Sequence, residues 1–264
     1  MRIVSVFIWI LLSITGCSML DTPEDETSTW SAKDIYVVAK EALNRGDYEG
    51  AIKYYEILEA RFPFELISQQ AQLDMIYAYY RFEEPESATV AADRFIKTYP
   101  THPYVDYAYY LKGLVNFEQN IGILDRYLPI DHSQRDQGAA LDAFYAFSDL
   151  ITRFPDSQYT ADAKQRMVYL RNTLAEHELH IAEFYLKRGA YVAAANRANT
   201  VVKSYQSTPT VPKALELMAT AYQLLGMKDL QESALRVLAL NYPSQNAEVG
   251  IEKTIPQPPN VSTM

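Results

Sequence analysis

Five segments of equal length share one pattern of landmark residues, and this repeat restricts the fold more than any other feature of the sequence. The clearest copy, residues 46–63, reads GDYEGAIKYYEILEARFP. It opens with a glycine, carries an alanine five residues later, and closes with an aromatic residue followed by a proline. The same frame fits residues 83–100, 138–155, 189–206 and 226–243. Repetition of this kind is typical of arrays in which each short unit buries its apolar face against its neighbours.

Two further positions keep their character in all five copies. The twelfth residue after each start is apolar: Leu58, Phe95, Leu150, Val201 and Leu238. The residue before the last is aromatic: Phe62, Tyr99, Phe154, Tyr205 and Tyr242. Three landmarks differ, with Glu83 in place of a glycine, Gln231 in place of an alanine and Gln206 in place of a proline. Because proline cannot continue a helix, each copy is predicted to be a helix that ends at its last residues.

A second apolar-periodic stretch precedes each copy, so the repeating unit is a helix, a glycine-containing turn, a second helix and a proline. The first helices are predicted at about residues 32–45, 68–82, 104–119, 159–188 and 211–225. This unit resembles the tetratricopeptide repeat (TPR). We therefore expect an all-α fold: a right-handed superhelix of five TPR-like helix-turn-helix repeats, with residues 120–137 as an insertion in the third repeat.

The N-terminus, MRIVSVFIWILLSITGCSML, has the pattern of a bacterial lipoprotein signal. One positive charge precedes an apolar run at residues 3–14, which is too short for a membrane span of about 20 residues. The letters ITGC resemble the lipobox, in which small side chains precede a cysteine whose thiol receives a diacylglycerol. Residues 1–16 are thus predicted to be a signal peptide and Cys17 the lipidated first residue, although an ordinary signal peptide with an incidental cysteine is the alternative. Ser18 follows instead of the aspartate of an inner-membrane retention signal, which favours the outer membrane.

The segments at the two ends of the predicted repeat array are unlike the repeats. Residues 17–31 are polar, acidic and without apolar periodicity, so they are predicted to be a flexible tether between the lipid and the folded domain. Residues 244–264 depart from the repeat frame and are predicted to be a disordered tail.

The composition argues against two classes of partner. The chain has 33 acidic and 24 basic residues, and its net charge is −9. A general nucleic-acid binder or a polybasic membrane-surface protein would carry the opposite balance, because both targets are anionic. Cys17 is the only cysteine, so the fold needs neither a disulfide nor a multi-thiolate metal site.

No motif of the sequence supplies a catalytic or metal site. The stretch HELH places His177 and His180 three residues apart, whereas a zinc peptidase needs the H-E-x-x-H spacing and a third ligand. There is no phosphate-binding glycine loop and no G-x-S-x-G nucleophile motif. We expect neither enzymatic activity nor a cofactor.

Tyrosines are concentrated in two short stretches, MIYAYYRF at residues 75–82 and DYAYYLKG at residues 106–113. Three tyrosines within four residues of a helix must cover more than one face. We expect most of them to pack between helices. At least one of each group is expected to reach a concave surface, where tyrosine offers contact area and a hydroxyl for peptide groups.

Three longer segments of the sequence resemble a known family. RFPFELISQQAQLDMIYAYY at residues 61–80, DRFIKTYPTHPYVDYAYYLKGL at residues 93–114 and the stretch at residues 153–197 are similar to the BamD (ComL) family, outer-membrane lipoproteins of the β-barrel assembly machine. The resemblance implies a lipid-anchored scaffold at the outer membrane, facing the periplasm. Its partners would be the periplasmic domains of the barrel subunit BamA, other lipoproteins of the machine, and unfolded outer-membrane proteins.

The resemblance also implies site residues. Residues 32–155 would form the repeats with a substrate groove, for which we name Phe64, Tyr77, Tyr80, Tyr107 and Tyr110. Residues 156–243 would dock BamA, and Arg197 in GAYVAAANRA would pair with an acidic residue there, because a guanidinium suits a bidentate carboxylate contact. The alternative function is another periplasmic TPR lipoprotein that coordinates cell-envelope or peptidoglycan machinery.

Overall fold

The computed structural model describes residues 26–121 and 137–243. The predicted signal peptide with Cys17, most of the predicted tether, nearly all of the predicted insertion and the predicted C-terminal tail therefore lie outside the described residues.

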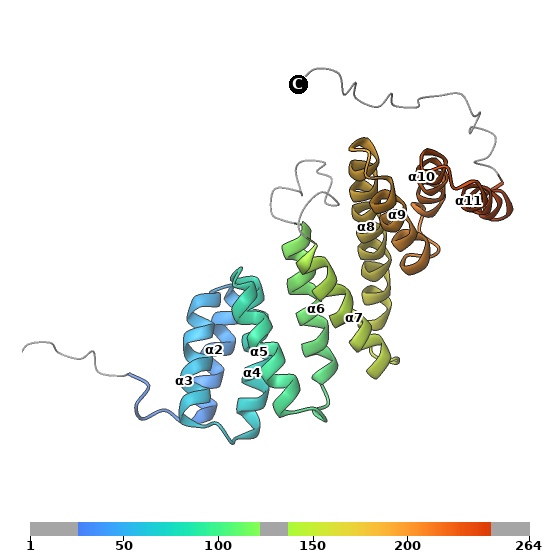
Figure 1. The fold of residues 1–264 in the computed structure, drawn as a ribbon. Coiled ribbons are helices and arrows are strands. Elements are labelled where there is room, and N and C mark those ends of the chain that lie inside the picture. The colour runs from blue at the N-terminus through green and yellow to red at the C-terminus, as the bar shows by residue number, and fades with distance from the viewer. Residues whose placement is uncertain (1–25, 122–136, 244–264) are drawn as a thin grey trace, which may run out of the picture. The chain divides into compact units, whose positions relative to one another are not determined.

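The described chain is entirely helical, which confirms the predicted all-α class, and it contains no strand (Figure 1). Its helices are α2 (Ala32–Arg45), α3 (Tyr48–Arg61), α4 (Leu66–Arg81), α5 (Pro85–Thr98), α6 (Val105–Ile121), α7 (Gly138–Arg153), α8 (Thr160–Lys187), α9 (Tyr191–Ser204), α10 (Val211–Leu224) and α11 (Lys228–Asn241). The first helix of each predicted unit begins and ends within two residues of its expected bounds. The number of repeats and the superhelical hand stay predictions.

The chain divides into two compact units, Met1–Ala71 and Gln72–Met264. In the first unit, α2 packs against α3. Ile35 and Ala39 of α2 and Tyr55 and Leu58 of α3 are fully buried. The Arg61 guanidinium of α3 donates a hydrogen bond to the Thr27 carbonyl, so the residues before α2 are held against the end of α3.

The second unit contains two apolar clusters, and the long helix α8 contributes to both. Leu170 and Leu174 belong to the cluster built mainly from α4, α5, α6 and α7. Leu179 and Ala182 belong to the cluster built from α8, α9, α10 and α11. Helices that follow one another from α5 to α11 pack together, and α8 also contacts α6 and α10. The two clusters are thus joined by one continuous helix.

The turn that opens four of the five repeat segments has a left-handed backbone. Gly46, Gly189 and Gly226 have φ angles of 80°, 76° and 71°. Glu83 stands at the same place in the frame and has φ 61°, although it carries a side chain. The third copy differs, because Gly138 is the first residue of α7 instead of a turn residue. Glycine adopts this region without the steric penalty that other residues meet, so Glu83 holds local strain.

The landmark at the end of each segment closes its helix. In every copy the backbone N–H of the aromatic residue donates to the carbonyl of the apolar residue four positions earlier, at 2.8–3.0 Å. Those five apolar residues are at most 1% exposed. Tyr205 adopts this C-cap conformation before Gln206 as well, so the aromatic residue keeps this helix end where the proline is missing. The alanines Ala51, Ala88, Ala143 and Ala194 are also fully buried, which explains their small size.

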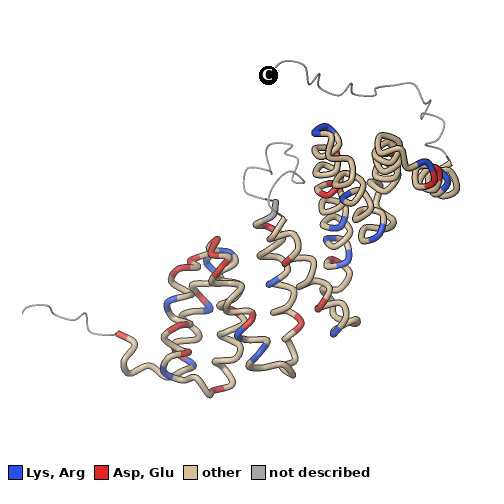
Figure 2. Tube along the Cα trace, viewed as in Figure 1, with Lys and Arg blue, Asp and Glu red and all other residues tan. Residues whose placement is uncertain are grey.

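Charged residues are spread over both units. Figure 2 shows acidic and basic positions interspersed along the helices, without a long stretch of one sign.

Candidate functional site

Four of the five predicted groove residues lie on two helices of the second unit. Tyr77 and Tyr80 are on α4, with ring centroids 6.2 Å apart. Tyr107 and Tyr110 are on α6, and all four side chains are partly buried against the first apolar cluster. The three-residue spacing within each pair puts its members on one helix face.

A fifth tyrosine completes this surface. Tyr159, the residue before α8, stacks on Tyr110 with centroids 4.6 Å apart and planes 17° apart. The centroid of the Tyr107 ring lies 5.4 Å from that of the Tyr159 ring. Sequence reasoning missed Tyr159, because its role depends on α8 beginning beside α6. We call Tyr77, Tyr80, Tyr107, Tyr110 and Tyr159 the tyrosine surface.

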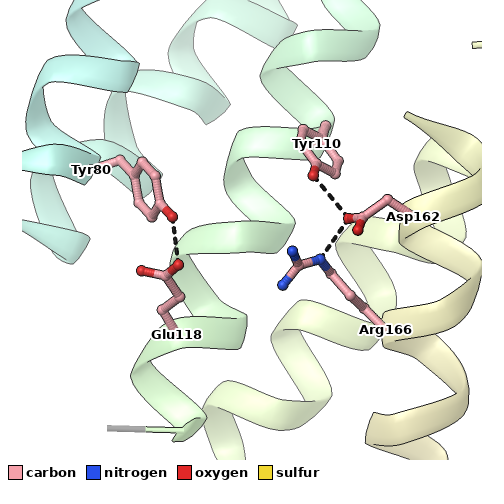
Figure 3. A network of polar contacts seen from close by, with 5 residues as sticks. All are labelled: Tyr80, Tyr110, Glu118, Asp162 and Arg166. Carbon is pink, nitrogen blue, oxygen red and sulfur yellow. Dashed lines mark hydrogen bonds and ion pairs between the residues drawn. The ribbon is translucent and has the colours of Figure 1, made fainter. Parts of the chain in front are cut away.

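Carboxylates accept hydrogen bonds from two of these tyrosines (Figure 3). The Tyr80 hydroxyl donates to Oε1 of Glu118 on α6 at 2.5 Å. The Tyr110 hydroxyl donates to Oδ2 of Asp162 on α8 at 2.8 Å. Nε of Arg166, one turn further along α8, donates to the same Asp162 oxygen at 2.6 Å. These bonds connect α4 to α6 and α6 to α8 along the tyrosine surface.

Burial and these acceptors raise the pKa values of the two phenols. Burial, with a smaller contribution from Glu118, raises the pKa of Tyr80 well above its ordinary value. Burial, reinforced by Asp162, raises the pKa of Tyr110 to about 12. Both hydroxyls therefore stay protonated to a higher pH than that of an ordinary tyrosine.

The basic group of the network is held by charge and by an aromatic face. Although burial opposes its charge, hydrogen bonding and attraction to Asp162 raise the pKa of Arg166. Its guanidinium carbon lies 4.7 Å from the centroid of the Phe117 ring, a favourable cation–π distance. The tyrosine surface thus offers aromatic area and fixed hydroxyl groups beside the oriented guanidinium of Arg166.

The remaining tyrosines of the two groups pack differently. Tyr109 of α6 lies 5.7 Å, centroid to centroid, from Phe154 at the end of α7, and the guanidinium of Arg153 lies 5.8 Å from its ring. Tyr79 of α4 is partly buried against the same apolar cluster. All six tyrosines of the two groups pack on the core. On α6, Tyr109 contacts Phe154 at the end of α7, whereas Tyr107 and Tyr110 contact Tyr159.

Phe64, the fifth residue predicted for the groove, lies in the first unit between α3 and α4. It is 96% exposed, and Leu66 nearby is 82% exposed. A phenylalanine this exposed contributes nothing to the core of its unit, so it is available for contact with another molecule.

Arg197, predicted to bind an acidic partner residue, lies on α9 and pairs with α8. Its NH1 donates to both carboxylate oxygens of Glu178, at 3.0 and 3.2 Å. The Arg197 side chain is 45% exposed and that of Glu178 only 16%. The mostly buried Glu178 therefore holds NH1 of the guanidinium, while the Arg197 side chain remains partly exposed.

The described residues contain no group of histidine, cysteine, aspartate and glutamate side chains that could hold a metal ion. His177 and His180 both lie on α8. No helix of the described ranges is long and apolar enough to span a membrane.

Comparison with known proteins places the chain in a family. The family model described as "Outer membrane lipoprotein" (YfiO) matches residues 29–238, from α2 into α11. A Neisseria meningitidis serogroup A protein named "Outer membrane protein assembly factor BamD" is 43% identical over 235 residues, which are 88% of each chain. The chain belongs to the BamD family.

Other BamD proteins are similar over the same extent. The one from Vibrio cholerae is 37% identical over 226 residues, covering 86% of this chain and 92% of that protein. The one from Xylella fastidiosa strain Temecula1 is 34% identical over 242 residues, covering 92% of this chain and 82% of that protein. Among solved structures, MamA protein aligns with a TM-score of 0.35 and 17% identity, covering 85% of this chain and 98% of that one.

Proposed function

We propose that this chain is a non-enzymatic assembly factor for outer-membrane β-barrel proteins, anchored by a lipid on Cys17 to the outer membrane and facing the periplasm. Membership of the BamD family over nearly the whole described chain carries this proposal. The name of the matching family model, an outer-membrane lipoprotein, and the N-terminal lipobox pattern support the anchor.

The proposed docking contact for the barrel subunit BamA is Arg197. The ion pair with Glu178 engages NH1 of the guanidinium and restrains its direction. A planar guanidinium can bind a second carboxylate through its remaining N–H groups, which makes an acidic residue of the partner a suitable acceptor. Because Arg197 is already oriented, such a contact loses little side-chain entropy on binding.

The tyrosine surface is proposed to receive unfolded outer-membrane proteins. Its rings offer large apolar area with few rotatable bonds, and its hydroxyls can pair with peptide groups of an extended segment. Phe64 is proposed as a further contact for the same substrates. The scaffold then holds a substrate segment near BamA without changing a covalent bond.

A pull-down tests the docking proposal. The lipidated protein is purified in mild detergent, and a barrel protein with periplasmic repeat domains is expected to co-purify with wild type and to be lost with Arg197→Glu. Lys97→Glu is the matched control, since it makes the same charge change at an exposed position on α5, outside the proposed docking region. Absence of such a barrel protein from the wild-type sample would contradict the assignment.

Binding of a peptide from the C-terminal strand of an outer-membrane barrel tests the substrate proposal. Wild type is expected to bind it, and Tyr77→Ala is expected to weaken binding at least tenfold while circular dichroism stays unchanged. Equal affinity of both proteins would remove Tyr77 from the proposed site.

A further inference from the structure

A cavity of about 310 Å³ lies in the second unit on the side of α6 that carries Tyr109. Thr89 and Asp93 of α5 form one wall, and Asp142, Tyr145 and Asp149 of α7 contribute to the opposite wall. We call it the α5–α7 pocket. Neither Arg197 nor any residue of the tyrosine surface lines it.

Helical spacing explains why these side chains meet. Asp142, Tyr145 and Asp149 are three and four residues apart, so they form one stripe along α7. Thr89 and Asp93 are four residues apart on α5 and likewise share a face. The pocket is therefore built by regular helix faces instead of by a loop.

The charge of the pocket is negative. Three aspartates line it against one lysine, Lys112 of α6, whose ammonium group binds Asp93 at 2.5 Å. That ion pair neutralises Asp93. The carboxylates of Asp142 and Asp149 on the α7 wall make no hydrogen bond or ion pair with any described residue, so both can accept from a group in the pocket.

A buried amide also lines the pocket. Asn116 of α6 is only 6% exposed, and its Nδ2 donates to the Lys112 carbonyl at 2.9 Å. Its Oδ1 accepts no hydrogen bond from the described residues. Asn116 lines the cavity, so this oxygen is able to accept a hydrogen bond from a donor that enters the pocket.

We propose that the α5–α7 pocket binds an arginine side chain of a partner protein. A guanidinium supplies a positive charge for Asp142 and Asp149, several N–H donors within reach of the Asn116 oxygen, and a flat face for the rings of Tyr109 and Tyr145. The Tyr109 ring already has one such neighbour, the guanidinium of Arg153. The volume lies at the lower end of the range for ligand pockets, roughly 300–1,000 Å³, and suits a single side chain.

Arginine fits this lining better than lysine. An ammonium group is compact and strongly hydrated, whereas a guanidinium spreads its donors in one plane and stacks on aromatic rings. Tyr145 is 62% exposed, so a partner side chain can reach it. This inference does not depend on the proposed function, because none of the residues named individually for BamA docking or for unfolded substrates lines the pocket.

Fluorescence anisotropy with the full mature chain tests the proposal. The probe is a labelled, uncharged Gly/Ser peptide with one central arginine, compared with the same peptide carrying lysine or citrulline. Citrulline has nearly the shape of arginine without its charge. We expect the arginine peptide to bind, the lysine peptide to bind several-fold more weakly, and the citrulline peptide at least tenfold more weakly.

Variants locate the site. Asp142→Asn with Asp149→Asn should weaken arginine-peptide binding at least tenfold, while Asp156→Asn, an exposed aspartate outside the pocket, should leave it unchanged. A photoreactive arginine peptide should crosslink to α7 near Tyr145. Equal binding of the citrulline peptide, unchanged affinity of the double variant, crosslinks elsewhere, or equally tight binding of spermidine would each overturn the assignment.

Discussion

The hydroxyl of Tyr110 donates a hydrogen bond to Oδ2 of Asp162, the same oxygen that accepts from Nε of Arg166 (Figure 3). One carboxylate oxygen thereby joins α6 to the start of α8. The Tyr110 ring meanwhile stacks on Tyr159, so a single side chain serves both packing and polar pairing. This connection holds the tyrosine surface in one arrangement.

Removing the Tyr110 hydroxyl should lower the stability of the second unit. Tyr110→Phe keeps the ring stack but leaves Asp162 with one donor fewer, and the expected loss is about 1 kcal/mol in the free energy of unfolding. Urea denaturation measures it. Tyr104→Phe is the control, since the Tyr104 hydroxyl bonds to no described residue; equal losses in the two variants would contradict the role of the bond.

Stability should also fall in a defined alkaline range. The pKa of Tyr110 is about 12 in the folded chain against an ordinary value of 10. Because the raised pKa favours the protonated phenol in the folded state, its contribution is complete below pH 10 and is lost as the pH rises from 10 to 12. Denaturation across this range should show a steeper decline for wild type than for Tyr110→Phe; parallel curves would contradict the shifted pKa.

The close approach of α6 and α7 at Gly113 gives a prediction about the core. A Cβ on Gly113 would meet the fully buried ring of Phe147, with Cδ1 at 2.5 Å. Overpacking of this kind destabilises by about 1–3 kcal/mol, and Gly113→Ala should do so. A double-mutant cycle provides the check: Phe147→Leu should recover part of the loss. Strictly additive effects would show that the two residues are not in conflict.

The strained turn at Glu83 should be improvable. Glu83→Gly removes the steric penalty of a left-handed residue, which is about 1–2 kcal/mol. Glycine also loses more conformational entropy on folding, and this smaller cost offsets part of the gain. The free energy of unfolding should therefore rise by up to about 1 kcal/mol. Gly226→Ala is the converse control, because a Cβ there meets no atom within 4 Å and only the backbone is affected. Thermal denaturation should move the two variants in opposite directions; a destabilised Glu83→Gly would mean that its side chain has a structural role.

The helices could be predicted from sequence because their ends are set locally. Glycine at a left-handed turn and proline after an aromatic C-cap act on the backbone within a few residues, whatever the rest of the chain does. Glu83 shows the limit of this reasoning. Its left-handed backbone follows from the adjacent helices, because glutamate by itself does not favour a positive φ angle.

The site was less predictable, because its contacts join residues far apart in sequence. Tyr77, Tyr80, Tyr107 and Tyr110 could be named from their spacing, but Tyr159 could not. The pairing of Arg197 with Glu178 across α8 and α9 was also missed, since it depends on how two helices pack. Likewise, the predicted functional division between residues 155 and 156 differs from the compact units, which separate at Ala71, and it stays a prediction.

The most direct test of the proposed function is depletion of this protein from its cells, followed by measurement of folded outer-membrane β-barrels through their heat-modifiable gel mobility. The proposed function predicts that folded barrels fall while inner-membrane proteins stay constant, and that wild-type protein restores them. Unchanged levels of folded barrels after depletion would contradict a role in their assembly.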